Sequence, residues 1–74
     1  MVYTVNQFEK IFKDCYPMMY RVAYSILEDS ENAKDVVGQV FTELWHRKPN
    51  IQEGATTGYL LVATKISAYI HFRN

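Results

Sequence analysis

The sequence predicts an all-α fold, a small bundle of three or four helices. Apolar residues recur at steps of three and four along three successive blocks, which is the period of a helix with one buried face. Residues that cap helix N-termini precede each block. The 74 residues, 49% hydrophobic and 22% charged, are too few for two domains and too apolar for a disordered chain. We therefore expect one helical domain over residues 1–74.

The first helix is expected over roughly residues 5–27. Thr4 and Gln7 have the spacing of a capping box, in which each side chain pairs with an unpaired backbone N–H at the helix start. Pro17 has no N–H and crowds the preceding turn, so it kinks or splits a helix. Because the apolar stripe keeps its phase across the proline, we expect a kink. The stripe consists of Phe8, Ile11, Phe12, Cys15, Met19, Val22, Ala23 and Ile26.

The second helix is expected over residues 31–47, after a polar connection in which Asp29 or Ser30 can act as the cap. Pro49 ends it. Gly38 costs a helix about 1 kcal/mol relative to alanine, which either the close approach of another backbone or chance drift would explain. The apolar stripe of this helix consists of Ala33, Val36, Val37, Val40, Phe41, Leu44 and Trp45.

The third helix is expected over residues 58–73, with Thr56 or Thr57 as its cap. Its apolar residues form two stripes, and one small bundle cannot bury both. The surplus predicts a missing neighbour, a dimer contact or a ligand surface. One stripe consists of Leu60, Leu61, Thr64 and Ala68, and the other of Tyr59, Val62, Ala63, Ile66, Tyr69 and Ile70.

The charge balance excludes a strongly polarised protein. Eight basic and eight acidic residues give a formal net charge of zero, so any nucleic-acid binding must be local. No apolar run approaches the ~18 residues of a membrane span, and the N-terminus lacks a secretory pattern. We expect a cytoplasmic protein without membrane contact.

The residues that carry catalysis or bind metals are nearly absent as clusters. The three glycines are isolated, so there is no phosphate-binding loop. His46 and His71 lie far apart without clustered cysteines or carboxylates, so no metal or other cofactor is expected. Cys15, the only cysteine, is in phase with the apolar stripe and is interpreted as a core residue. We expect a protein that is not an enzyme and has no catalytic residue.

The order of features along nearly the whole chain resembles a known family. The run FEKIFKDCYPMMYRVAYSILEDSENAKDVVGQVFTELWHRKPNI, followed by GYLLVATKISAYIHFRN, resembles region 2 of the extracytoplasmic-function (ECF) group of bacterial RNA polymerase sigma factors, in the sigma-70 family. The sequence looks most like members from Bacteroides relatives. The most specific parts are the opening from Phe8 through Tyr16-Pro17 to Tyr20, the spacing from Asp29 through Ala33 and Asp35 to Val40-Phe41, Leu44-Trp45, and Tyr59-Leu60.

The resemblance implies a three-helix bundle, often described with a short additional helix, that binds the RNA polymerase core. In the family, the exposed face of the second helix docks on the clamp helices of the largest polymerase subunit. The matching polymerase-binding positions are Asp35, Gly38, Gln39 and Glu43. Family members commonly have glutamine then glutamate where this sequence has Gly38 then Gln39, so one polar contact and one charge are missing.

The resemblance also implies that the loop before the last helix, together with that helix, captures the non-template strand of the minus-ten promoter element. Such capture needs aromatic rings on which bases stack and cations for the phosphates. Ile66 and Ile70 form an apolar patch where family members present polar groups, which weakens this inference. The candidate DNA-binding residues are Arg47, Lys48, Asn50, Tyr59, Lys65, Tyr69 and Arg73.

Two hypotheses follow. The leading one is a promoter-recognition and core-polymerase-binding module of an ECF sigma factor, with an anti-sigma factor as a further partner. The alternative is a degenerate sigma-like helical interaction domain without DNA recognition, including a homodimer through the third helix. The region 4 domain of sigma factors is absent from this chain, so we expect either a fragment of a sigma factor or a naturally short sigma-like protein.

Overall fold

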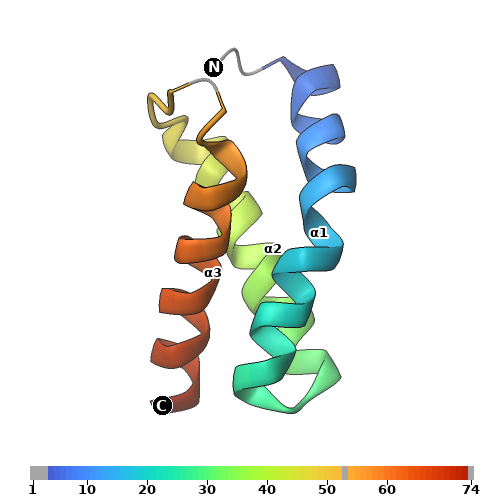
Figure 1. The fold of residues 1–74 in the computed structure, drawn as a ribbon, viewed down its shortest axis with the longest axis vertical. Coiled ribbons are helices and arrows are strands. Elements are labelled where there is room, and N and C mark those ends of the chain that lie inside the picture. Colours follow the sequence, from blue (N-terminus) through green and yellow to red (C-terminus); the bar gives the residue numbers. More distant parts are fainter. Residues whose placement is uncertain (1–3, 53, 74) are drawn as a thin grey trace.

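Three helices in an up-down-up arrangement make up the fold in a computed structural model, which describes residues 4–52 and 54–73. They are α1 (Val5–Leu27), α2 (Ser30–Arg47) and α3 (Thr56–Arg73), and each contacts the other two (Figure 1). Within the described residues there is no strand and no fourth helix. The predicted all-α fold is confirmed, in its three-helix form.

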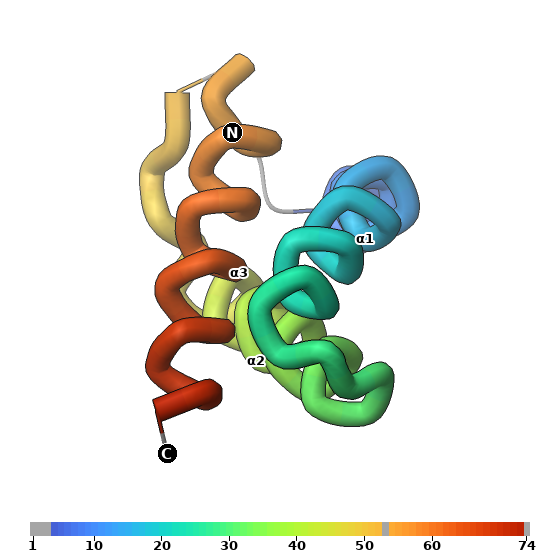
Figure 2. The backbone as a smooth tube through the Cα atoms, turned by 60° about the horizontal axis from the view of Figure 1, so that its bottom comes forward, coloured from blue at the N-terminus to red at the C-terminus, as the bar shows by residue number. Residues whose placement is uncertain are grey.

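α1 begins and ends with clear local signals. The Gln7 N–H donates to the Thr4 hydroxyl at 3.2 Å, as expected for Thr4 as the cap. The helix runs unbroken through Pro17, and its axis changes direction near the middle (Figures 1 and 2). It ends at Glu28, whose left-handed backbone (φ 53°) lets its N–H donate to the Tyr24 carbonyl.

α2 follows after a very short connection. The Asp29 carboxylate accepts the Asn32 N–H at 2.9 Å, so Asp29 is the cap and the helix begins at Ser30, one residue earlier than expected. The Tyr20 hydroxyl donates to the Ser30 hydroxyl at 3.1 Å and ties α1 to this turn. A left-handed residue, Lys48 (φ 44°), ends the helix.

The prediction for the start of α3 was wrong by two residues. α3 begins at Thr56, and the Tyr59 N–H donates to the Ala55 carbonyl at 3.0 Å, which puts Ala55 at the cap position. Thr56 and Thr57 therefore lie in the first turn and are not caps. The Thr57 hydroxyl lies instead 3.9 Å from the Cys15 sulfur, so it faces α1.

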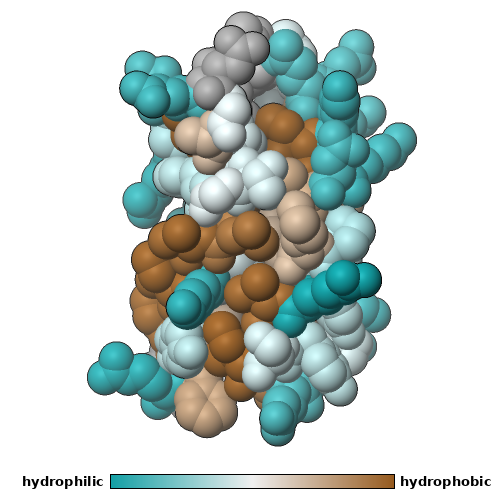
Figure 3. All heavy atoms as spheres, viewed as in Figure 1, coloured by the Kyte–Doolittle hydropathy of each residue, from teal (hydrophilic) through white to brown (hydrophobic). Residues whose placement is uncertain are grey.

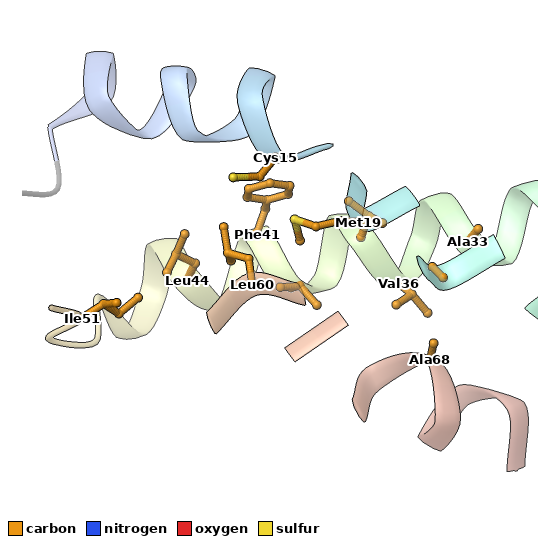
Figure 4. Packing of buried hydrophobic residues seen from close by; sticks show 12 residues of the cluster. Cys15, Met19, Ala33, Val36, Phe41, Leu44, Ile51, Leu60 and Ala68 are labelled. Atoms are coloured by element: carbon orange, nitrogen blue, oxygen red, sulfur yellow. The ribbon is translucent and has the colours of Figure 1, made fainter. Parts of the chain in front are cut away.

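All three helices and the loop contribute to one core (Figure 4). Cys15 and Met19 of α1 lie against the ring of Phe41, and Leu60 of α3 fills the space beside them. Ile51 is buried and anchors the loop before α3. The interpretation of Cys15 as a core residue is confirmed. The buried apolar residues are Cys15, Met19, Ala23, Ala33, Val36, Val37, Val40, Phe41, Leu44, Ile51, Leu60 and Ala68.

The bundle buries only one of the two stripes of α3, as the sequence predicts. Leu60, Thr64 and Ala68 are fully buried, and the Thr64 hydroxyl donates to the Leu60 carbonyl at 2.7 Å, which satisfies this buried polar group. Figure 3 shows apolar side chains gathered on the surface over α3. The large apolar side chains that α3 exposes are Tyr59, Val62, Ile66, Tyr69, Ile70 and Phe72.

Candidate polymerase and nucleic-acid interfaces

The four predicted polymerase-binding residues lie together on the outer face of α2. Asp35, Gln39 and Glu43 are four residues apart, so they share one side of the helix, and all three are exposed. Gly38 is exposed beside them. The opposite side of α2 carries six buried apolar residues, which hold this polar face against a rigid core. We call the four residues the polar face.

Gly38 is not explained by close packing within the fold. A Cβ added at Gly38 would meet nothing within 4 Å, so no other backbone of the bundle approaches it. The Thr42 hydroxyl donates to the Gly38 carbonyl at 2.8 Å, which continues the polar surface along the helix. Of the two explanations for this glycine, close packing inside the bundle is wrong.

An apolar groove runs between α1 and α2, next to the polar face. Its volume is about 380 Å³, and its rings pack edge-on or tilted, with 5.0 Å between the centroids of Phe8 and Trp45 and 4.7 Å between those of Phe12 and Phe41. Helical periodicity assigns these rings to the core, yet Phe12 is 39% exposed. We call it the aromatic groove, lined by Phe8, Phe12, Gly38, Phe41, Thr42 and Trp45.

Sequence reasoning missed the aromatic groove, although one signal for it was present. Gly38 and Thr42 are the two residues of α2 that line both the groove and the depression along the outer side of the helix. A glycine in a helix at the edge of an aromatic stripe leaves the rings uncovered, because it has no side chain to lie over them.

Lys48, one of the predicted DNA-binding residues, contacts a residue that lines the aromatic groove. Its ammonium group lies 4.5 Å from the centroid of the Trp45 ring, in a cation–π contact. The left-handed backbone at Lys48 directs the chain away from the helix at this point. A role for Lys48 in DNA binding stays a prediction.

A second hollow lies between the loop and α3. This cleft is open to solvent, with a volume of about 640 Å³, and Asn50 and Tyr59 are among its lining residues. Ile51 is buried at its base, so the loop is held in place. Val62 and Ile66 of α3 form its apolar wall. Two of the predicted DNA-binding residues therefore line one cleft, which we call the loop cleft.

Three more predicted DNA-binding residues form a stripe along α3. Lys65, Tyr69 and Arg73 are four residues apart and all exposed, so they share one side of the helix. The segment 56–73 contains no aspartate or glutamate, so this stripe carries positive charge without a carboxylate on its own helix. Arg47, also exposed, is the last residue of α2 before the loop. Lys65 and Arg73 therefore provide local positive charge of the kind that nucleic-acid binding by a neutral chain would need.

The described residues contain no group of three or more histidine, cysteine, aspartate or glutamate side chains that could hold a metal ion. In the same part of the chain, no helix combines the length and apolar character that crossing a membrane demands.

Comparison with known proteins places the chain in a family. The model of the family described as sigma-70 region 2 matches residues 11–74, which is most of the chain. The chain therefore belongs to the sigma-70 region 2 family. Domains of this family are non-enzymatic, act in transcription initiation, and bind the RNA polymerase core and promoter DNA. No curated protein and no solved structure matches the chain.

Proposed function

We propose that this chain is the promoter-recognition and core-polymerase-binding module of an ECF sigma factor, and that it captures the minus-ten element of the opened promoter. The observation that carries this proposal is the segregation of two exposed surfaces on different helices. The polar face of α2 contains Asp35 and Glu43, two of the three carboxylates of that helix, whereas α3 has cations and tyrosines and no carboxylate. Family membership supports both activities.

The polar face docks on the clamp helices of the largest polymerase subunit. Asp35, Gln39 and Glu43 offer two charges and one amide along about two turns of helix. Because α2 is backed by buried side chains along its length, these groups are held in fixed positions and lose little freedom on binding.

The loop cleft and α3 bind the separated non-template strand. Tyr59 and Tyr69 provide exposed rings for base stacking, and Lys65 and Arg73 provide cations for the phosphates. The loop cleft has a volume typical of small-molecule sites, about 300–1,000 Å³, and its apolar wall with Asn50 at the rim suits a base turned out of the stack.

An anti-sigma factor and a second copy bound through α3 stay predictions, as does the cytoplasmic location that a polymerase partner requires. The alternative of a degenerate interaction domain without DNA recognition is not favoured by the family match.

The test is a crossed pair of charge reversals measured by fluorescence anisotropy. Asp35→Lys should weaken binding to core RNA polymerase and leave binding to labelled single-stranded minus-ten-type oligonucleotides unchanged, and Lys65→Glu should do the reverse. The matched controls are Asp14→Lys and Lys10→Glu, which make the same charge changes at exposed positions of α1. Equal effects of a variant and its control would mean that net charge, and not the proposed surface, governs binding.

A further inference from the structure

The aromatic groove is open at the place where a side chain of α2 would otherwise cover it. Gly38 lies at its edge, and an added Cβ there meets nothing within 4 Å. Phe12, on the opposite wall, is 39% exposed. A glycine inside a helix and an exposed phenylalanine are each unfavourable for folding, and here they occur at one spot. Folding alone therefore does not account for the groove.

The aromatic groove is continuous with the polar face. Gly38 and Thr42 line the groove, and the same two residues lie with Gln39 and Glu43 along a shallow depression on the outer side of α2. A helix that crosses the polar face at Gly38 would therefore bring its neighbouring side chains to the aromatic groove, which Gly38 and Trp45 both line.

We infer that the aromatic groove receives one apolar side chain of the polymerase clamp helices, so that Gly38, Phe12 and Trp45 determine polymerase affinity together with the polar face. This inference rests on the proposed function, since it takes the polar face as the docking surface. An apolar side chain in an aromatic pocket, surrounded by polar contacts, is the arrangement of an interface hot spot.

The chemistry of the groove selects the occupant. Its rings offer apolar walls, and the ammonium group of Lys48 lies over Trp45, so a basic side chain would be repelled and an aliphatic or methionine side chain fits. The lack of a Cβ at Gly38 lets the partner backbone come close enough for a side chain of this size to reach Phe41.

Substitution at Gly38 tests the inference without disturbing the fold. Gly38→Gln should weaken binding to core RNA polymerase by about tenfold, as for a filled hot-spot pocket, and Gly38→Ala should weaken it less. Alanine and glutamine are both better helix formers than glycine, so a loss of polymerase affinity in either variant cannot come from unfolding. Ser25→Gln is the matched control, because it also adds a long polar side chain at an exposed helical position, on α1 and outside both the aromatic groove and the polar face. Its polymerase affinity should stay unchanged.

A second readout reports on the groove itself. Trp45 is the only tryptophan of the chain and lines the groove, so its emission should shift to shorter wavelength when a tryptophan-free clamp-helix fragment binds. Gly38→Gln should abolish this shift.

The outcomes separate the two proposals. If Asp35→Lys weakens polymerase binding but Gly38→Gln does not, or if Trp45 emission stays constant on binding, the groove inference is overturned and the proposed function stands. If neither variant changes polymerase binding, the polar face is not the docking surface and both proposals fail.

Discussion

α2 and α3 have the same length, 18 residues, but they distribute their apolar side chains in opposite ways. α2 buries six of them on one side and presents polar residues on the other. α3 buries only Leu60, Thr64 and Ala68 and exposes most of its other large apolar side chains, with Val62 59% exposed.

The difference shows that the two helices carry functional information of different kinds. The polar outer side of α2 is what any amphipathic helix would show, so only family membership and the neighbouring groove mark it as a docking surface. The exposed apolar side of α3 is unusual for a small domain and predicts contact with another molecule or another copy. The surface of α3 therefore gives the stronger indication of a binding site, although α2 contributes more buried residues to the core.

The largest expected effect separates the two sides of α3. Leu60→Ala should lower the free energy of unfolding by about 2–5 kcal/mol, because Leu60 is fully buried among all three helices. Val62→Ala, on the exposed side, should change it by no more than about 0.5 kcal/mol. Urea unfolding followed by circular dichroism measures both. Equal losses would mean that the surplus stripe contributes to the core after all.

The next effect concerns the surplus stripe itself. Tyr59→Ala should weaken binding of single-stranded minus-ten-type oligonucleotides by about 1–3 kcal/mol, the usual contribution of one stacked base. Tyr24→Ala serves as the control, since Tyr24 is an exposed tyrosine on α1 with comparable accessibility. Anisotropy titrations of the two variants give the comparison, and a Tyr59 variant that binds like the wild type would remove stacking from the account.

A smaller effect tests the positive stripe. Lys65→Gln should reduce the dependence of log affinity on log salt concentration by about 0.7, the value for one phosphate contact to a single strand. Lys10→Gln, the same change at an exposed position of α1, should leave the slope unaltered. Titrations at a series of salt concentrations measure the slope. An unchanged slope for the Lys65 variant would place the phosphates elsewhere.

The smallest effect is expected at the buried polar residue of α3. Thr64→Val should change the free energy of unfolding by less than about 1 kcal/mol, because the Thr64 hydroxyl bonds only within its own helix turn and valine has a similar shape. Thermal unfolding followed by circular dichroism tests this. A loss as large as that expected for Leu60→Ala would indicate that the hydroxyl holds the bundle together.

The fold was predictable because its signals are local. The bounds of α1 and α2 follow from the sequence to within one residue. They are marked by the caps Thr4 and Asp29 and by the phase of the apolar stripes. The start of α3 was predicted two residues late, because Thr56 and Thr57 are good caps in isolation, whereas in the structure the Ala55 carbonyl accepts the Tyr59 N–H and puts both threonines in the first turn.

The candidate site was predictable in its surfaces and less so in its details. Spacing places Asp35, Gln39 and Glu43 on one side of a helix whatever the rest of the chain does. The aromatic groove was not predicted, because the exposure of Phe12 depends on how α1 crosses α2 opposite Gly38. The contact of Lys48 with Trp45 is local, because the two residues are three positions apart at the end of α2.

The central claim is that polymerase and promoter DNA bind to two separate surfaces of this domain. Chemical-shift mapping of the isotopically labelled chain tests it most directly. Addition of a clamp-helix fragment should move the amide signals of Asp35 to Glu43 and the indole signal of Trp45. A single-stranded minus-ten-type oligonucleotide should move those of Asn50, Tyr59 and the stripe from Lys65 to Arg73. If both ligands move the same set of signals, or if the oligonucleotide moves only α2, two separate surfaces do not exist and the account is contradicted.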